Sequence, residues 1–337
     1  MDSRLGGNDE VPVVLAQAGT QEISTGHFLL DSRLRGSDGG SPMNPLIAID
    51  WGTSSLRAAR IAADGSVREE RASDRGILTV PPSGFPDALA QIAGDWLAAP
   101  DTLCLISGMA GSRQGWQEAP YAPCPAGFDE IADALSWVEP GRVALVPGLC
   151  CEHDGVPDVM RGEEVQVFGA LALQGASEGL LVLPGTHSKW VRVQGGRVTT
   201  FATCMSGEFY ALLRSQSILA RTLPAEDGPL DAQAFLRGVR HARAAGSLLA
   251  SAFSVRTLAL FDALPAAAQP SYLSGLVIGE ELRLHANDAQ PVTLVGSATL
   301  TERYALALAD LGIATHRFGA EATWRGLWAL ARTLQRS

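Results

Sequence analysis

The sequence predicts an α/β protein of two duplicated domains that face each other across a cleft. One unit occurs twice in the chain: a short apolar strand, a Gly-Thr-x-Ser loop, a second strand, a glycine turn and a third strand. The two Gly-Thr pairs begin at Gly52 and Gly185, so the copies are separated by nearly half the chain. Repetition at this spacing is typical of related domains, and the space between two domains is a common ligand site.

Each copy has the residue pattern of strands joined by tight turns. In the first copy, LIAI (Leu46–Ile49) precedes DWGTSS, the strand LRAARIA, an Ala-Asp-Gly turn and the strand SVREERA. In the second copy, LLVL (Leu180–Leu183) precedes PGTHSK, the strand WVRV, a Gly-Gly turn and the strand RVTTFATC. Short apolar runs bounded by glycine turns are typical of strands in a buried sheet.

Further strands and helices alternate along the rest of the chain. Apolar runs predict three more buried strands, namely LCLI (Leu103–Ile106), VALV (Val143–Val146) and VTLVG (Val292–Gly296). Apolar residues at helical spacing predict three helices. The first begins at Glu163, the second follows an N-cap at Ser297 or Thr299, and the third spans Ala322–Leu334. The apolar stripe of the last helix is interpreted as core packing.

The first 43 residues differ from the rest and predict a poorly structured extension. DSRLGGND near the start returns almost unchanged as DSRLRGSD, and the segment between them has no strand or helix period. Met43 is a candidate start of translation, whereas a regulatory arm has no residue pattern to support it. We therefore divide the chain into an extension (1–43), a first domain (44–178) and a second domain (179–337).

The composition excludes several classes of function. The formal net charge is −10 and the basic residues are scattered, whereas nucleic-acid binding needs clustered Lys and Arg. No apolar run approaches the ~20 residues that a membrane span needs. The five cysteines form no CxxC pair, which favours reduced thiols. We expect a cytoplasmic protein with neither nucleic-acid nor membrane partners.

The first Gly-Thr loop has the residue types of a phosphate cradle beside a metal-facing carboxylate. Gly52 lets the backbone approach a phosphate, and the amides and hydroxyls of Thr53, Ser54 and Ser55 can surround an anion. Asp50, at the strand end, can orient Mg²⁺ through water molecules. An Asx-type turn is the alternative, but the second copy of the loop favours phosphate binding.

The second loop carries basic side chains where the first carries an acid. Alignment of the Gly-Thr pairs puts Leu183 in the place of Asp50, and the second loop adds His187 and Lys189. This asymmetry predicts a metal on one side and phosphate donors on the other, although a solvated Lys189 and a turn-bound His187 are the alternatives. The candidate nucleotide-binding residues are Gly52, Thr53, Ser54, Ser55 and Arg57 in the first loop and Gly185, Thr186, His187, Ser188 and Lys189 in the second.

Two acidic residues open the helix that begins at Glu163. A helix N-terminus favours anions, so simple helix-start electrostatics would explain Glu163 and Glu164. A carboxylate base for a hydroxyl acceptor is the functional alternative, and it typically contributes ~10²–10⁴ in rate. We favour Glu164 as this base, with Glu163 second.

Several motifs together resemble the 2-dehydro-3-deoxygalactonokinase family of the sugar-kinase, Hsp70 and actin superfamily. The resemblance runs from about residue 44 to the C-terminus and rests on IAIDWGTSSLRAA, ISGMAGSRQGWQEAPY, MRGEEVQVFGAL, LPGTHSKWV, MSGEFYALL and GSATLTERYALAL. It implies two ribonuclease H-like domains of the actin/hexokinase type, with ATP and Mg²⁺ in the cleft between them. It also implies phosphorylation of the 6-hydroxyl of a 2-keto-3-deoxy sugar acid.

The same resemblance extends the set of candidate site residues. A sugar acid carries a carboxylate, for which an Arg among hydroxyls is the expected partner. The candidate substrate-binding residues are Ser107, Arg113, Trp116, Glu118, Tyr121 and Arg161, and the loop at Gly296 and Ser297 matches the adenosine position. A kinase for another sugar, a phosphatase and a non-catalytic sugar sensor are the alternatives, and a homodimer is a candidate assembly.

Overall fold

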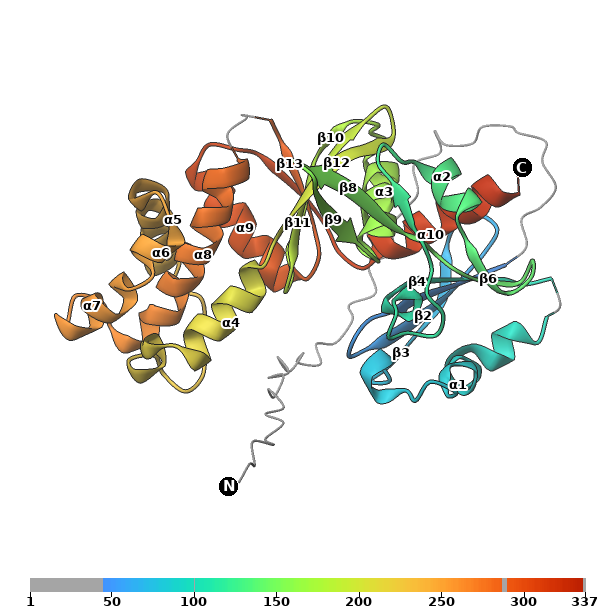
Figure 1. The fold of residues 1–337 in the computed structure, drawn as a ribbon, viewed down its shortest axis with the longest axis horizontal. Helices are drawn as coiled ribbons and strands as arrows, with labels where there is room; N and C mark the ends of the chain where they lie inside the picture. Colours follow the sequence, from blue (N-terminus) through green and yellow to red (C-terminus); the bar gives the residue numbers. More distant parts are fainter. Residues whose placement is uncertain (1–44, 100, 287–289, 336–337) are drawn as a thin grey trace, which may run out of the picture. The chain divides into compact units, whose positions relative to one another are not determined.

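The computed structural model describes residues 45–99, 101–286 and 290–335. The expected N-terminal extension and Met43 lie outside these ranges. Two mixed sheets form the framework (Figure 1). Their strand orders are β3-β2-β1-β4-β7-β6 and β12-β11-β10-β13-β14. The first five strands of each sheet follow one scheme, in which a central strand has an antiparallel neighbour on one side and a parallel neighbour on the other.

The first sheet separates two apolar cores because its strands alternate between faces. From β1, Ile47, Ile49 and Trp51 enter one core, whereas Leu46 and Ala48 enter the other. The strands are β1 (Leu46–Trp51), β2 (Leu56–Ile61), β3 (Val67–Ser73), β4 (Leu103–Gly108), β6 (Ser136–Glu139) and β7 (Val143–Leu145).

The second sheet repeats the expected strand, loop, strand, turn and strand. Its second strand starts earlier than predicted, because Lys189 pairs with Leu183 across the two strands and belongs to the sheet. The strands are β10 (Gly179–Leu183), β11 (Ser188–Gln194), β12 (Arg197–Cys204), β13 (Val292–Val295) and β14 (Thr315–Phe318).

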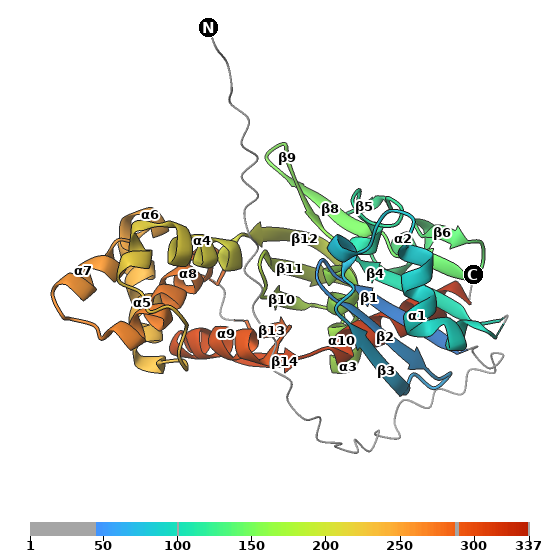
Figure 2. The same cartoon turned by 90° about the horizontal axis from the view of Figure 1, so that it is seen from below.

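A small third sheet connects the first half of the chain to the second sheet. It contains β5 (Tyr121–Pro123), β8 (Gly148–His153) and β9 (Val156–Met160). The Asp158 carboxylate of β9 accepts hydrogen bonds from the backbone N–H and the hydroxyl of Thr203 in β12, at 2.7 and 2.5 Å. This contact fixes the β8–β9 hairpin beside β12 (Figure 2).

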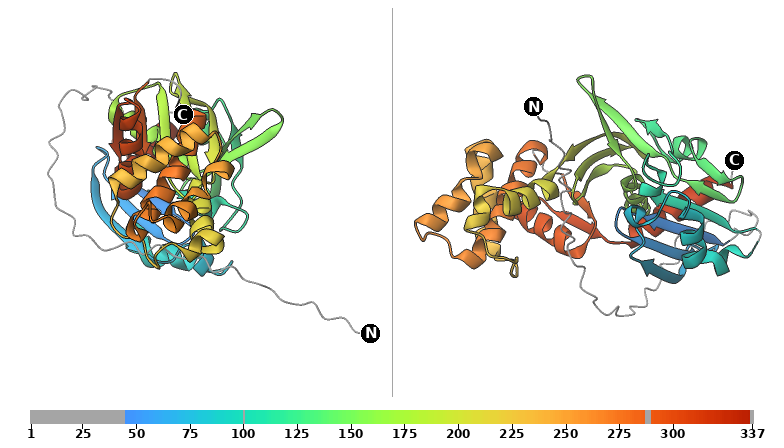
Figure 3. Two further views of the ribbon diagram at one scale, coloured as in Figure 1. Left: turned by 90° about the vertical axis from the view of Figure 1, so that its left-hand side faces the viewer. Right: turned by 60° about the horizontal axis from the view of Figure 1, so that its bottom comes forward.

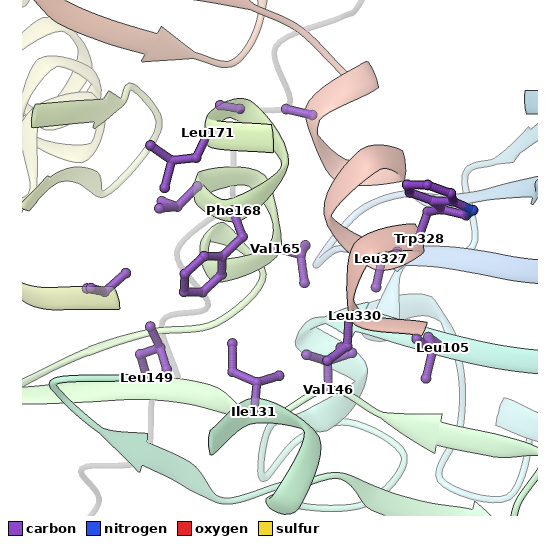
Figure 4. Packing of buried hydrophobic residues seen from close by; sticks show 14 of the residues in the cluster. Leu105, Ile131, Val146, Leu149, Val165, Phe168, Leu171, Leu327, Trp328 and Leu330 are labelled. Carbon is purple, nitrogen blue, oxygen red and sulfur yellow. The ribbon is translucent and has the colours of Figure 1, made fainter. Parts of the chain in front are cut away.

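The helices α3 (Glu163–Gln174) and α10 (Glu321–Leu334) pack side by side, with α10 on the first sheet and α3 next to β13 of the second (Figure 4). Two glycines allow this approach. A Cβ atom on Gly169 would lie 1.7 Å from the backbone oxygen of Ala322, and one on Gly326 would lie 1.9 Å from that of Val165. The predicted stripe of the last helix is confirmed, because Trp324, Leu327, Trp328 and Ala331 are all buried.

Helices also cover the remaining faces of the two sheets. The helices are α1 (Phe85–Leu97), α2 (Phe128–Asp133), α4 (Ser206–Gln216), α5 (Ala232–Ala245), α6 (Leu248–Ser251), α7 (Ser254–Leu260), α8 (Gln269–His285) and α9 (Ala298–Asp310). Figure 3 shows α4 to α8 gathered into one helical segment. Ser297 holds the N-cap position of α9 without a side-chain capping bond. All five cysteines are free.

Within the described ranges, each helix is too short or too polar to cross a membrane.

The Gly169→Ala variant tests the contact between α3 and α10. We expect it to lower the free energy of unfolding by about 1–3 kcal/mol, because the added methyl group forces the two helices apart. Gly94→Ala in α1 is the matched control: its Cβ would meet only the Ala90 side chain, at 3.8 Å. That variant should gain about 0.5–1 kcal/mol from helix propensity. Urea unfolding of both proteins measures the difference, and equal effects would contradict the packing argument.

Candidate active site

Polar side chains gather where β1 and β4 end beside the start of α3. Asp50 of β1 stands next to Ser107 of the parallel strand β4 and opposite Arg57 of the antiparallel strand β2. Strand alternation puts all three on the face that α3 and α10 cover, since Ala48, Leu105 and their neighbours enter that core. The sequence prediction that Asp50 and Ser107 belong to one site therefore agrees with their strand register.

Asp50 and Arg57 form an ion pair across the two strands. The guanidinium also lies 5.7 Å from the ring centroid of Trp324 in α10, a cation–π distance. Arg57 therefore holds the carboxylate of Asp50 in a fixed position at the strand end. It is anchored between the sheet and the last helix and does not project freely into solvent.

The first Gly-Thr loop is exposed to solvent on one side and packs closely against Gly76 on the other. The Gly52 N–H bonds the Ser55 oxygen at 2.8 Å, and the side chains of Thr53, Ser54 and Ser55 lie in solvent. A Cβ atom on Gly76 would lie 2.3 Å from the Thr53 oxygen. Sequence reasoning missed Gly76, because nothing in its neighbourhood predicts that it supports a loop more than twenty residues earlier.

Glu164 is a fully buried carboxyl at the start of α3. Its Oε2 accepts the Gly162 N–H at 2.6 Å, and its Oε1 lies 3.5 Å from the Ser107 hydroxyl. Burial, with a smaller contribution from the charge of Glu163, raises the pKa of Glu164 from 4.5 to about 8. Only two donors reach this carboxyl among the described residues, so the protonated form is favoured at neutral pH.

Glu163 lies beside Glu164 but is half-buried. Its carboxylate accepts the Arg161 N–H at 2.9 Å. Burial raises the pKa of Glu163, and the positive charge of Lys189 opposes this shift. Lys189 comes from the second sheet, so the first turn of α3 is influenced by charges from both halves of the chain.

Two glycines let the start of α3 approach the end of β4. Gly108 has φ +96° and Gly162 has φ +102°, in the region that favours glycine. A Cβ atom on Gly108 would lie 2.7 Å from the Trp51 oxygen, and one on Gly162 would lie 3.2 Å from Cα of Gly108. Larger residues at these positions would move Glu164 away from Ser107.

Lys189 is buried and connects the second sheet to β9. Its ammonium group donates to the Val159 oxygen at 2.8 Å and to the Thr203 hydroxyl at 2.7 Å. An ammonium group has three donors, so these two bonds leave one N–H for another acceptor. The alternative of a solvated Lys189 is wrong, because its exposed fraction is 6%. His187 instead lies near the surface and bonds Glu208 of α4 at 2.6 Å.

The loop before α9 and the start of α4 both pack on the second Gly-Thr loop. A Cβ atom on Gly296 would lie 3.5 Å from the Pro184 oxygen, and one on Gly207 would lie 2.5 Å from the Gly185 oxygen. The Glu208 N–H also bonds the Thr186 oxygen at 3.1 Å. The second Gly-Thr loop and the loop that the sequence assigned to adenosine binding are therefore neighbours in space.

The loop expected to bind the acceptor divides into a packed part and an exposed part. Trp116 stacks on Phe85, with centroids 6.2 Å apart, and contacts Trp51 at 6.4 Å. Arg113 is 86% exposed and pairs with the exposed Glu118 at 2.9 Å. In the described part of the chain, neither Trp116 nor the Arg113–Glu118 pair makes a hydrogen bond or ion pair with Glu164.

Arg161 has a different environment from Arg113. Its Nη2 donates to the Ala119 oxygen at 2.7 Å, and its guanidinium lies 4.3 Å from the ring centroid of Tyr121. Its Nε and Nη1 are buried without a hydrogen-bond acceptor among the described residues, and the hydroxyl of Ser112 is likewise unpaired. A Cβ atom on Gly111 would lie 2.9 Å from Nη1. Unsatisfied buried donors of this kind are costly unless a ligand supplies acceptors.

The acidic residues fit a magnesium ion that is held mainly by nucleotide and water. No cluster of three or more His, Cys, Asp or Glu placed to hold a metal occurs in the described ranges. Mg²⁺ in kinases is usually bound through one or two carboxylates together with substrate phosphates. Asp50, beside the exposed hydroxyls of the first loop, is the side chain here that suits this role.

Comparisons with known proteins give one consistent result. Residues 50–330 match the 2-keto-3-deoxy-galactonokinase family. The chain is 36% identical over 269 residues to the 2-dehydro-3-deoxygalactonokinase of Escherichia coli K12, which covers 79% of this chain and 90% of that protein. It is 38% identical over 297 residues to a protein of Rhizobium meliloti 1021 named as a probable enzyme of the same kind, covering 85% and 96%.

A crystal structure gives the same result in three dimensions. A Sinorhizobium meliloti protein described as a 2-dehydro-3-deoxygalactonokinase superposes with a TM-score of 0.78 at 38% sequence identity. The match covers 86% of this chain and 99% of that one.

The raised pKa of Glu164 predicts how stability depends on pH. Between about pH 4.5 and pH 8 the native state binds more protons than the unfolded state, so stability falls as pH rises across this window. The Glu164→Gln variant lacks this term and should gain a few kcal/mol relative to wild type over the same window. Urea unfolding of both proteins at several pH values measures the difference in the free energy of unfolding. This difference should grow with pH and level off above about pH 8. A difference independent of pH would show that Glu164 titrates normally.

Proposed function

Because this chain belongs to the 2-keto-3-deoxy-galactonokinase family, we propose that it transfers the γ-phosphoryl group of ATP to the 6-hydroxyl of 2-dehydro-3-deoxy-D-galactonate. The product would be 2-dehydro-3-deoxy-6-phosphogalactonate, formed in the breakdown of galactonate. The observation that carries the proposal is the meeting of two acids at the start of α3 with the carboxyl ends of β1 and β4. This edge of the sheet also holds the first phosphate loop.

When bound, ATP·Mg²⁺ supplies the phosphoryl group and neutralises charge that develops during transfer. The protein's own residues then have to position two ligands and move one proton. Thr53, Ser54 and Ser55 would donate to phosphate oxygens, and Asp50 would hold Mg²⁺ through water. The free N–H of Lys189 would reach a phosphate from the second loop. Gly296 and Ser297 would pass beneath the adenosine.

Access favours Glu163 over Glu164 as the catalytic base, which reverses the order favoured from the sequence. A base must come within hydrogen-bond reach of the acceptor hydroxyl. Glu164 is fully buried and bonded to Gly162, whereas Glu163 is half-buried. The positive charge of Lys189 also stabilises ionised Glu163. Glu164 would act as a buried support that holds Ser107 and the backbone before α3.

Arg161 replaces Arg113 as the proposed partner of the substrate carboxylate. The guanidinium of Arg161 has two buried donors without acceptors, and it lies two residues from Glu163. A carboxylate would accept a charge-assisted hydrogen bond from one of these donors. Tyr121 and Ser112 would form the same subsite. Arg113 already has a carboxylate partner in Glu118.

The shared strand order of the two sheets supports two ribonuclease H-like domains of the actin/hexokinase type. We keep the division near residue 178, with one change to the proposed ranges 44–178 and 179–337: α10 packs on the first sheet and on α3, and so belongs with the first domain. In this arrangement ATP would lie in a cleft between the Gly-Thr loops, and closure would exclude water. A cytoplasmic location and a homodimer stay predictions.

ADP release by the purified protein tests the proposed reaction. We expect turnover with ATP·Mg²⁺ and 2-dehydro-3-deoxy-D-galactonate, and much less with galactonate or glucose, because neither of these two is a 2-keto-3-deoxy acid. The gluconate epimer, which is one, measures the selectivity of the site at a single carbon. Turnover with glucose instead would point to another sugar kinase. ATP binding without ADP release for any acceptor would favour a sensor.

Two matched variants show whether this turnover comes from the proposed site. Glu163→Gln should lower kcat by about 10²–10⁴, the usual contribution of a general base. Glu164→Gln should lower it less, and the opposite order would restore Glu164 as the base.

The Arg161→Gln variant tests the proposed carboxylate partner. We expect KM for the sugar acid to rise about tenfold or more, because a hydrogen bond to a charged group is worth about 1.5–3 kcal/mol. KM for ATP should stay unchanged. Arg113→Gln is the control and should leave both KM values as they are. The assignment is wrong if Arg113→Gln, and not Arg161→Gln, weakens sugar-acid binding.

A further inference from the structure

Glu281 is a buried carboxylate that none of the roles above uses. It lies on α8 and is 2% exposed. Its Oε1 accepts the Ser188 hydroxyl at 2.6 Å and the Trp190 indole N–H at 2.5 Å. Its Oε2 accepts the Tyr304 hydroxyl at 2.7 Å and also the Ser206 hydroxyl. Four side-chain donors therefore meet at one carboxylate.

The donors come from the elements that hold the proposed nucleotide loops. Ser188 lies between His187 and Lys189 in the second Gly-Thr loop and begins β11. Ser206 is the first residue of α4, and Tyr304 belongs to α9, which follows the loop at Gly296. One side chain on α8 thus joins the three elements that surround this loop.

Two further contacts couple the position of the second Gly-Thr loop to the position of Glu281 and its four donors. The start of α4 packs tightly on the loop, where a Cβ atom on Gly207 would lie 2.8 Å from Cα of Thr186. The ring of Trp190 stacks on His285, one turn beyond Glu281 on α8, with centroids 5.3 Å apart. A shift of the α8 carboxylate would therefore move the loop together with the start of α4.

The chemistry of the junction requires an acceptor at Oε1. The indole N–H of Trp190 can only donate, so Oε1 must accept. No cation pairs with Glu281 in the described part of the chain, and a buried carboxylate without a cation is tolerated only when hydrogen bonds satisfy it. Burial raises the pKa of Glu281, and the four hydrogen bonds oppose this shift. Such fully satisfied polar networks fix one geometry.

We propose that Glu281 is a positioning residue for the nucleotide, which holds the 185–189 loop in register with the starts of α4 and α9. This inference rests on the proposed function, in which these elements bind ATP. Within the described part of the chain, no residue contacts both Arg161 of the sugar-acid subsite and Glu281. Loss of the carboxylate should therefore affect ATP and the sugar acid differently.

The Glu281→Gln variant tests this role because it keeps the size of the side chain. Its NH₂ group cannot accept a hydrogen bond, so the hydroxyls of Ser206 and Tyr304 have to rotate to accept from it and lose their bond to a carboxylate oxygen. We expect KM for ATP and the Kd for ADP to rise about tenfold, the effect of one lost buried hydrogen bond, while KM for the sugar acid stays constant. The matched control is Glu280→Gln, the next residue on α8, which pairs with Arg283 of the same helix at 2.7 Å. It should bind ATP and ADP like wild type.

Tyr304→Phe provides a second test that does not depend on the folding of Glu281→Gln. It removes one of the four donors and leaves the carboxylate in place, so KM for ATP should rise by a smaller factor. An unchanged affinity for ATP and ADP in both variants would overturn the inference. Equal rises in both KM values would also overturn it, since that outcome indicates a general loss of structure.

Wild-type measurements separate failure of this inference from failure of the proposed function. Wild-type protein that neither binds ADP nor turns over ATP would overturn both. Normal wild-type kinetics with an unaffected Glu281→Gln variant would overturn the positioning role alone.

Discussion

The close contact between α3 and α10 is the constraint on which the site depends. Backbone atoms of the two helices meet at Gly169 and Gly326, where no side chain fits. Helix α10 also packs on β1 and β4, so it fixes the distance between the first sheet and the start of α3. Glu163 and Glu164 lie on that first turn. A helix near the end of the chain therefore sets the position of two acids about 160 residues earlier.

Each half of the chain has a buried carboxylate near the proposed site, Glu164 on α3 and Glu281 on α8. The surroundings of the two carboxylates differ. Glu164 has one backbone donor at 2.6 Å, a hydroxyl at 3.5 Å and a second acid beside it. Glu281 has four donors within hydrogen-bond distance. Burial raises the pKa of both carboxyls, and the four side-chain hydrogen bonds of Glu281 oppose the rise there. The two side chains therefore differ in how firmly they are held, because Glu281 is bonded to four neighbouring side chains.

The sequence predicted the strands of both copies because short apolar runs and glycine turns are local signals. It also named Asp50, Ser107 and the two glutamates as site candidates, from their residue types and from their places at strand ends and at a helix start. It made no prediction for the helices between Ser206 and His285, although Asp231 caps the start of α5 and Gly246 ends that helix with a positive φ. Gly76 and Glu281 were missed because their partners lie far away in the sequence. Only the folded chain brings those groups together.

The two Gly-Thr units also show how similar strands acquire different roles. In the first sheet the residue opposite the strand end is Arg57, and it closes on Asp50 within its own sheet. In the second sheet Lys189 is opposite Leu183, which offers no charge. Its ammonium group donates both to Thr203 of its own sheet and to the backbone of β9, two residues before Arg161. Replacement of one acid by leucine thus turns a cation that closes its own sheet into one that links the two halves beside Glu163.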